Sequence, residues 1–476
     1  MTDRTLNIDT VSKAGQEVTV AGWIANRRDH GKLIFLDLRD HTGLLQVVVN
    51  PKVSADAHST AEKLRSEFVV VIKGKVNDRP ANMVKAELST GTVELEATEI
   101  NILSEAQTPP FELDETKDVN EETRLKYRYL DLRSPRMQNN LRIKHKTTSL
   151  VREYLDKKGF IEIETPLLTK TSPEGARDFL VPSRYNPGKF YALPQSPQQY
   201  KQLLMLAGFD RYYQMARCLR DEDTRRDRVL EHTQIDMEMS FVTEEEVRAI
   251  VEGMMIYVVE SLGKKVLQKP FPVYTHEQAV QEFGADKFDL RTEKNPEVFA
   301  FAWVVDFPLF DYDQEEKKYT FAHNPFSAPK AEDVDKLLKG EDLGDLRAQQ
   351  YDLVCNGLEL GSGGVRISDP QVQRKVFEIM GLSPEQTEER FGHLIKAYEY
   401  GAPPHAGIAP GLDRLVMLLT NEEDIREVIA FPTTASGQTA VMDAPSPATE
   451  QQLKELHLKI DKPEIRNPKS ETKSNT

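Results

Sequence analysis

Residues 1–105 alternate apolar and polar side chains in short runs, a period of two that suits β-strands with one buried face. Turn residues such as His41-Thr42-Gly43 separate several of the runs, and residues 61–68 indicate one short helix. The alternating runs lie at 18–23, 33–40, 45–49, 69–76 and 93–102. Five strands with a helix between the third and the fourth predict a small Greek-key barrel.

The pattern changes after this barrel. Residues 106–122 carry Pro109-Pro110 and a run of acids with few apolar residues, which predicts a hinge. We expect four parts: an OB-fold barrel, of the oligonucleotide-binding type, at 1–105, a hinge at 106–122, a second domain at 123–460 and a disordered tail at 461–476. In the second domain a helix expected at 149–158 is followed by strand-like runs at 160–165 and 299–305. This mixture favours an α+β fold.

Composition limits the classes of function. The formal net charge of −15 argues against a protein that coats nucleic acid, although local basic patches remain compatible with it. The two cysteines, Cys218 and Cys355, cannot form a disulfide framework. No apolar run of membrane-spanning length and no charged-then-apolar leader is found in the sequence, so we expect a soluble cytoplasmic protein without a membrane partner.

Three segments could carry chemistry. Residues 159–166 read as a turn and an edge strand that ends at a proline. Residues 220–238 read as two alternating strands joined by a charged loop, which could equally be an ordinary solvated hairpin. Residues 407–414 form a glycine-rich strand end that feeds a helix, and Arg414 falls in its first turn. A cation there is unfavourable beside the helix dipole unless an anion lies nearby, so Arg414 indicates anion binding.

These segments resemble the three motifs of the class II aminoacyl-tRNA synthetases. Nearly the whole chain is similar to the bacterial aspartyl-tRNA synthetase family, most specifically through the strings at 124–133, 173–178, 192–198 and 429–432. The resemblance implies a catalytic domain built on an antiparallel sheet, a homodimer with its interface around the first motif and Pro166, and ATP-dependent joining of L-aspartate to tRNA through an aspartyl-adenylate.

Adenylate formation is an in-line attack of a carboxylate on the α-phosphate of ATP, so the protein mainly positions reactants and stabilises negative charge. The resemblance assigns Arg220 to the α-phosphate, Arg414 to the far phosphates and Glu222 to the adenine amino group, as the catalytic set. The ATP-binding residues that it implies are Arg220, Asp221, Glu222, His232, Gln234, Glu359, Gly411 and Arg414, with Arg225 and Arg228 for the tRNA acceptor end.

The family's candidates for a magnesium ion are Asp352 and Glu359. Asn356-Gly357 is a strong hairpin turn that should pair Val354 with Glu359 and set Asp352 on the same face, although two surface acids on a hairpin remain the alternative. The small residues at 361–364 predict close approach of a ligand.

Selection of aspartate needs cations facing its side-chain carboxylate. Ser196-Pro197 predicts a helix start that puts Gln198 and Lys201 on one helix face. The resemblance makes Lys201 and Arg366 the carboxylate ligands. It gives the α-ammonium to Glu174 and Asp236, hydrogen bonds to Ser196 and Gln198, and a nearby place to His323. The barrel suits anticodon reading by base stacking and edge contacts. The resemblance assigns these contacts to Phe35 as a stacking ring, Gln46, Arg79 and Glu94, with Arg27, Arg28, Asp29 and His30 close by.

The sequence departs from the family at three places. A large inserted domain of the bacterial relatives is absent, and only a link at about 292–298 remains. His232 stands where relatives stack a phenylalanine on adenine. An imidazole can also stack, so we expect either weaker ATP binding or ATP binding that weakens below about pH 6. Asn324 and Val229-Leu230 replace a histidine and a glutamine-proline pair of the relatives, which affects the expected acceptor-end contacts.

Three alternatives remain open. An asparaginyl or a lysyl relative would share the fold, and the lysine enzyme would need an acidic pocket in place of Lys201 and Arg366. A non-catalytic tRNA-binding paralogue would be expected to lose Arg220 or Arg414, which this chain keeps. Finally, His30 in the loop at 28–31 leads us to the hypothesis that the tRNAs for aspartate and asparagine are both charged.

Overall fold

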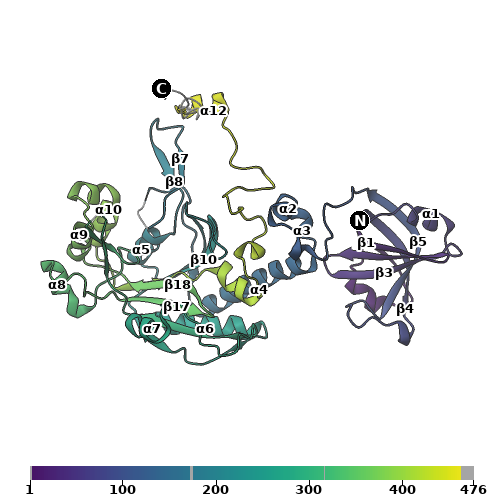
Figure 1. Cartoon of the computed structure of the whole chain (residues 1–476), viewed down its shortest axis with the longest axis horizontal. Coiled ribbons are helices and arrows are strands. Elements are labelled where there is room, and N and C mark those ends of the chain that lie inside the picture. Colours follow the sequence, from purple (N-terminus) through teal and green to yellow (C-terminus); the bar gives the residue numbers. More distant parts are fainter. Residues whose placement is uncertain (1–2, 172–174, 316, 462–476) are drawn as a thin grey trace, which may run out of the picture. The chain divides into compact units, whose positions relative to one another are not determined.

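The computed structural model describes residues 3–171, 175–315 and 317–461, and the chain divides into two compact units, residues 1–116 and 117–476 (Figure 1). The division falls within the segment 106–122, whose role as a hinge stays a prediction. Glu174 and nearly all of the expected tail lie outside the described residues.

The first unit is a closed five-stranded barrel with strand order β1-β2-β3-β5-β4, as the alternation predicts. Its strands are β1 (Glu17–His30), β2 (Leu33–Asp40), β3 (Gly43–Val49), β4 (Val69–Asp78) and β5 (Val93–Ser104). β1 is longer than expected because its first half pairs with β4 and its second half with β2, with a register shift between Ile24 and Asn26. Such an irregularity bends a strand, which lets one strand serve both neighbours.

The short helix of the barrel was misplaced by the sequence pattern. The expected range was 61–68, whereas α1 spans Ala55–Ala61 and begins where the Ser54 hydroxyl accepts the Ala57 N–H. Ala61, Leu64 and Phe68 are buried at helical spacing, but only Ala61 belongs to α1; Leu64 and Phe68 reach the barrel core from the irregular connection to β4, where Glu67 has a left-handed φ of 66°.

The second unit is built on an eight-stranded sheet with order β12-β14-β17-β18-β19-β10-β9-β6, in which only the β12–β14 and β6–β9 pairs are parallel. The expected α+β fold on an antiparallel sheet is thereby confirmed. The sheet strands are β6 (Ile161–Glu162), β9 (Arg211–Leu219), β10 (Glu231–Ser240), β12 (Val273–Thr275), β14 (Phe301–Val305), β17 (Gln350–Cys355), β18 (Leu358–Val365) and β19 (His405–Ile408).

One face of this sheet carries the main core. Helices α4 (Pro135–Lys157), α6 (Glu244–Ser261) and α11 (Leu412–Leu419) pack there against side chains such as Met237 and Trp303. Figure 1 shows α6 lying along β17 and β18. Helix α4 starts well before the expected residue 149, because Ser134 caps it and Pro135 occupies its first turn.

The opposite face is only partly covered, by α5 (Gln198–Leu206) and α7 (His276–Phe283). The remaining elements are α2 (Glu121–Lys126), α3 (Arg128–Asp131), β7 (Leu180–Pro182), β8 (Phe190–Ala192), β11 (Lys265–Val266), β13 (Val298–Phe299), β15 (Phe310–Asp313), β16 (Lys318–Phe321), α8 (Val334–Lys339), α9 (Pro370–Ile379), α10 (Pro384–Tyr398) and α12 (Glu450–Glu455), besides short 3₁₀ turns.

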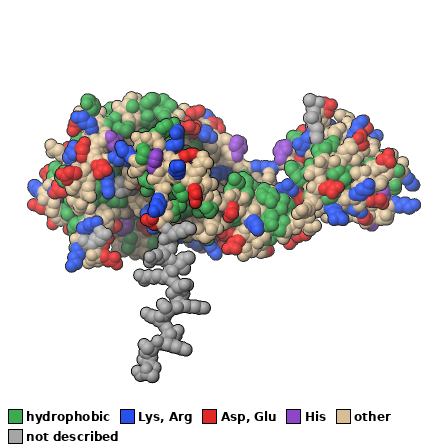
Figure 2. All heavy atoms as spheres, turned by 90° about the horizontal axis from the view of Figure 1, so that it is seen from above, with side chains coloured by type: hydrophobic (Ala, Val, Ile, Leu, Met, Phe, Trp, Pro, Cys, Tyr) green, Lys and Arg blue, Asp and Glu red, His purple; other side chains and the backbone are tan. Residues whose placement is uncertain are grey.

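The surface carries charges of both signs. Figure 2 shows acidic and basic side chains intermixed over the visible face of each unit. This agrees with the acidic net charge, which disfavours a continuous basic coat. Within the described ranges, no helix is long and apolar enough to cross a membrane.

Candidate active site

A cleft of about 560 Å³ opens on the partly covered face of the second unit's sheet. Its wall combines α5, β10, the loop between β9 and β10, the β17–β18 hairpin and the start of α11. The sequence-predicted residues that line it are Ser196, Gln198, Lys201, Arg220, Glu222, Arg225, Arg228, His232, Gln234, Asp236, His323, Glu359, Arg366, Gly411 and Arg414. Of the described site residues predicted in the second unit, Asp221 and Asp352 are not part of this lining.

Strand β10 supplies the floor of the cleft through its period of two. Ile235, Met237 and Met239 point into the main core, so Gln234, Asp236 and Glu238 share the other face. Glu238 is fully buried and was not among the predicted site residues. The same alternation that marks Asp236 could have identified it, because the two carboxylates are two residues apart.

Four buried charges form a cluster beneath the cleft. The ammonium of Lys201 lies 2.7 Å from Asp236 Oδ1 and 3.3 Å from Glu238 Oε2. The guanidinium of Arg366 donates to both oxygens of Glu238, at 2.9 and 3.2 Å. All four side chains are at most 3% exposed as residues. Buried charges persist only when they are paired and hydrogen-bonded, and here each cation has an anionic partner.

The pKa values of the two acids in the cluster are shifted in opposite directions. Burial raises the pKa of Glu238, but Arg366 and Lys201 outweigh that effect and hold this pKa below its usual value. Burial dominates at Asp236, whose pKa is raised despite Lys201. Asp236 Oδ2 has no well-formed hydrogen bond in the described structure, although the Tyr212 hydroxyl is close enough to act on this carboxylate. Asp236 is therefore the member of the cluster best able to accept another donor.

Gly407 makes room for this cluster. It pairs with Glu238 across β10 and β19, and a Cβ atom there would lie 2.0 Å from Glu238 Oε2. The glycines at 361, 363 and 364 allow close packing of neighbouring segments, since Cβ atoms on them would meet Pro410, the Gly407 carbonyl and Ser327 respectively. Gly361 and Ser362 also line the cleft, so close approach of a ligand to this stretch stays a prediction.

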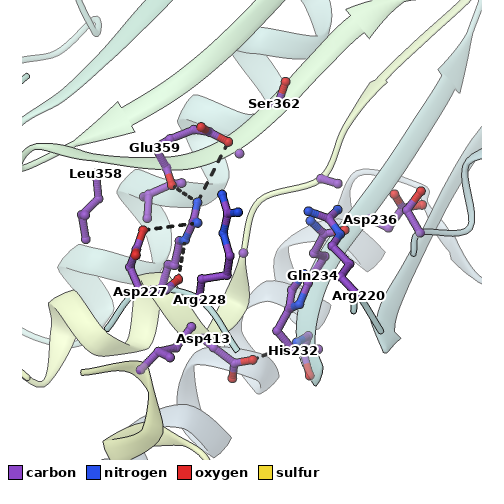
Figure 3. A pocket seen from close by; sticks show the side chains of 18 of the residues that line it. Arg220, Asp227, Arg228, His232, Gln234, Asp236, Leu358, Glu359, Ser362 and Asp413 are labelled. Atoms are coloured by element: carbon purple, nitrogen blue, oxygen red, sulfur yellow. Dashed lines mark hydrogen bonds and ion pairs between the residues drawn. The ribbon is translucent and has the colours of Figure 1, made fainter. Parts of the chain in front are cut away.

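A second group of charges surrounds Arg414 at the start of α11. Its guanidinium donates to the Glu359 carbonyl at 2.8 Å and to the Asp227 carbonyl at 3.2 Å. Figure 3 shows Glu359 and Asp227 on one side of the cleft, with Arg220, Gln234 and Asp236 on the other. The preceding Asp413 accepts the Thr233 N–H at 2.8 Å, which fixes the helix start against β10.

The predicted metal ligands lie on the β17–β18 hairpin. Val354 pairs with Glu359 as predicted, but a register shift next to it sets Asp352 opposite Ser362. Asp352 is buried, and burial together with the charge of Glu359 raises its pKa well above the usual value. His323 Nε2 lies 3.7 Å from Asp352 Oδ2. Lys287, which the sequence gave no reason to select, lies 2.8 Å from Glu359 Oε2.

The loop between β9 and β10 carries the remaining predicted residues. Arg220 donates to the Gln195 carbonyl at 3.3 Å, and Glu222 accepts from Arg228 at 2.6 Å. His232 lies near four arginines; burial first, and then Arg220 and Arg414, lower its pKa to about 3. The expectation that His232 titrates near pH 6 was therefore wrong, because a partly buried imidazole surrounded by cations stays neutral.

The predicted anticodon residues gather on the outside of the barrel. Phe35 is half-buried while its neighbours Ile34 and Leu36 fill the core, so its ring faces outward. Arg28 pairs with Phe35 across β1 and β2. Gln46 donates to Glu94 at 3.1 Å, and Arg79 Nε lies 3.9 Å from the same carboxylate.

At the edge of this face, Arg27 forms a two-pronged ion pair with Asp29, and His30 is exposed. One terminal nitrogen of Arg79 is buried without a hydrogen-bond partner among the described residues. An outward-facing ring can stack on a base, and the neighbouring amide, carboxylate and guanidinium groups can hydrogen-bond to base edges.

Comparison with known proteins agrees with this geometry. Residues 120–435 match the family of class II tRNA synthetases (D, K and N), and residues 18–103 match the OB-fold nucleic acid binding domain. The chain therefore belongs to the class II tRNA synthetases of the D, K and N group.

Within that class the chain is similar to particular enzymes. It is 41% identical, over 97% of its length and 96% of the relative's, to the Aspartate--tRNA(Asp/Asn) ligase of Heliobacterium modesticaldum. It is also 41% identical, over 95% of its length and 98% of the relative's, to the Aspartate--tRNA ligase of Staphylococcus saprophyticus. The crystal structure of asparaginyl-tRNA synthetase from Pyrococcus horikoshii with asparaginyl-adenylate has a TM-score of 0.72 and 21% identity, and the match covers 89% of this chain and 96% of that one. This structural likeness supports the fold alone.

The alignment with the Heliobacterium enzyme spans 586 positions, whereas the chain has 476 residues. The alignment must therefore contain a long gap in this chain, as expected for the absence of an inserted domain. In the structure the segment between α7 and β13 is a short connection, and β13 and β14 follow it directly.

Proposed function

We propose that this protein is an aspartate–tRNA ligase, which activates L-aspartate with ATP and transfers it to tRNA. One observation carries the proposal: Lys201 and Arg366 are fixed at the floor of the same cleft into which Arg220 and Arg414 project. Two cations suit the substrate's side-chain carboxylate, and two further guanidinium groups suit phosphates. A lysine-specific pocket would instead need acids that remain unpaired.

In this mechanism the chain mainly positions groups. Asp236, with one oxygen short of a partner, would accept the α-ammonium of aspartate. Arg220 would hold the α-phosphate while the substrate carboxylate attacks it, and Arg414 would hold the far phosphates of the leaving pyrophosphate. Arg220 makes one long hydrogen bond to a carbonyl, so most of its donors can turn to a ligand.

Asp352 and Glu359 fit a magnesium ion. Magnesium in nucleotide sites takes one or two carboxylates together with phosphate oxygens. Within the described residues no group of three or more potential ligands forms a self-sufficient metal site, which agrees with that mode of binding. The raised pKa of Asp352, caused by burial and by Glu359, is the situation that a cation between the two would relieve. When bound, such an ion would neutralise charge on the phosphates.

The tRNA contacts follow from the two units. The outward face around Phe35 and Gln46 would read the anticodon, and Arg225 and Arg228 beside the cleft would meet the acceptor end. We further propose that the tRNAs for aspartate and for asparagine are both charged. The Heliobacterium relative is named an Aspartate--tRNA(Asp/Asn) ligase, and this name together with the exposed His30 supports the finer proposal.

A homodimer is the assembly that we propose. β6 is the edge of the large sheet, and Ile161, Leu167 and Leu168 are each about half exposed beside it. An apolar sheet edge of this kind calls for a partner. Light scattering of the purified protein at micromolar concentration tests the assembly; a monomer would contradict it. A cytoplasmic location, where tRNA is charged, completes the proposal.

The function is tested by exchange and charging assays. Exchange of pyrophosphate into ATP should depend on aspartate and not on asparagine or lysine, and the protein should then aspartylate purified tRNA. Exchange with asparagine alone would favour the asparaginyl alternative, and no exchange with any amino acid would favour a non-catalytic paralogue. Failure to charge the asparagine tRNA would remove the dual-specificity part only.

A further inference from the structure

Lys287 belongs to the segment between α7 and β13, the short connection that stands next to the missing insertion. Its ammonium lines the main cleft and lies 2.8 Å from Glu359 Oε2. Arg414 reaches the other oxygen of the same carboxylate at 4.0 Å. Glu359 therefore has a cation on each side, and Lys287 lies at the end of the cleft where Arg414 is.

The backbone holds Lys287 in this place. The next residue, Phe288, is buried, and its ring stacks on Phe283 with centroids 4.1 Å apart. The Phe288 carbonyl accepts the N–H of Gly357, in the turn that leads into Glu359. The segment is thus joined to the hairpin tip, which brings the Lys287 side chain to Glu359, although this side chain is itself exposed.

The charges around Glu359 change when nucleotide enters. Under the proposed function, Glu359 is a ligand of a divalent cation, which would take the carboxylate that Lys287 now contacts. An ammonium beside a divalent cation is repelled and needs another anion. The triphosphate of ATP is the anion that arrives at the same moment, and a flexible lysine side chain can turn to it.

We propose that Lys287 is a phosphate-binding residue of this site: it pairs with Glu359 in the empty protein and turns to the β- or γ-phosphate of ATP when the nucleotide binds. The inference rests on the proposed function and adds to it a third cation for the triphosphate, beside Arg220 and Arg414. The rival role is purely structural, with Lys287 holding Glu359 in place in both states.

Equilibrium binding separates the two roles without turnover. ATP and AMP are titrated calorimetrically into the full-length protein, in magnesium buffer without amino acid, for the unaltered chain and for Lys287→Ala. Loss of one charged contact should weaken ATP binding at least about tenfold. AMP lacks the β- and γ-phosphates, so its affinity should be unchanged, and that result also shows that the variant is folded.

Lys294→Ala is the matched control. Lys294 lies on the same segment and pairs with Asp289 at the same distance, 2.8 Å, but it does not line the cleft. Its removal should leave both affinities unchanged, and Lys287→Arg should keep most of the ATP affinity. Equal ATP affinity in Lys287→Ala and the unaltered protein, or an equal loss for ATP and AMP, would overturn the inference. If the unaltered protein itself binds no ATP, the proposed function fails first.

Discussion

Replacement of His232 by phenylalanine tests the electrostatics of the cleft. The structure lowers the pKa of His232 to about 3, through burial first and then the surrounding arginines. At about pH 5.5 such an imidazole is almost entirely neutral, whereas one with the ordinary pKa of about 6.5 would be roughly nine-tenths protonated. If protonation of His232 blocked adenine stacking, ATP affinity would fall about 11-fold at this pH with the ordinary pKa of about 6.5. With the lowered pKa of about 3, ATP affinity would not change.

The assay is the ATP dissociation constant of the unaltered protein and of His232→Phe at about pH 7.5 and about pH 5.5. Protonation of ATP itself affects both proteins equally. The ratio of their two ATP dissociation constants therefore reports only the effect of His232. We expect that ratio to be the same at both pH values. A ratio that changes about tenfold, with the unaltered protein weaker at the lower pH, would refute the assigned neutrality.

The lowered pKa of His232 also makes the unfolding free energy depend on pH. A histidine with a lowered pKa in the folded state stabilises the fold fully above its unfolded pKa of about 6.5, and this stabilisation is lost as the pH falls towards about 3. When the pH is lowered from about 7 to about 5.5, the unaltered protein should lose roughly 1 kcal/mol of unfolding free energy because of His232. His232→Phe should not show this loss. Urea unfolding at the two pH values measures the difference.

Three further substitutions probe other parts of the chain. Arg414→Ala should reduce aspartate-dependent pyrophosphate exchange at least about 100-fold, because an oriented donor to developing phosphate charge is lost; activity within about tenfold would contradict this role. Glu238→Gln leaves Lys201 and Arg366 under-compensated and should lower the unfolding free energy by about 3 kcal/mol in urea, against less than about 0.5 kcal/mol for the exposed control Glu378→Gln. Phe35→Ala should weaken tRNA binding by about 1 to 3 kcal/mol in a filter assay and leave exchange unchanged, and an altered exchange rate would argue against an anticodon role.

Local chemistry explains which elements were predictable from the sequence. The Asn356-Gly357 turn fixes its own hairpin, so the pairing of Val354 with Glu359 was predicted correctly. The register shift between Leu353 and Val354 was missed. The helix predicted at residues 61–68 was wrong because Leu64 and Phe68 are spaced like a helix face, while they fill the barrel from the irregular connection between α1 and β4.

In the candidate site, too, some residues were predictable from the sequence and others were not. Strand alternation places Asp236 and Glu238 on one face and could have found both, because the period of two needs no tertiary knowledge. A lone lysine in a polar segment carries no such pattern, so only the fold brings Lys287 to Glu359. The pKa of His232 was likewise beyond the sequence, since it depends on arginines from three separate elements.

Lys201 and Arg366 have N–H donors that the carboxylates of the buried cluster do not use, and these donors affect whether the site selects aspartate or asparagine. Lys201 and Arg366 already balance Asp236 and Glu238, so no uncompensated charge draws the substrate in. What they can still offer are N–H groups: an ammonium has three donors and a guanidinium five, and the contacts with these two carboxylates occupy only some of them. A carboxylate meets such donors with two acceptor oxygens. The amide of asparagine would turn an NH₂ group towards donors and leave it without a partner, at a cost of roughly 1 to 3 kcal/mol. Selectivity for aspartate then follows from hydrogen-bond polarity, held in place by Glu238, more than from net charge.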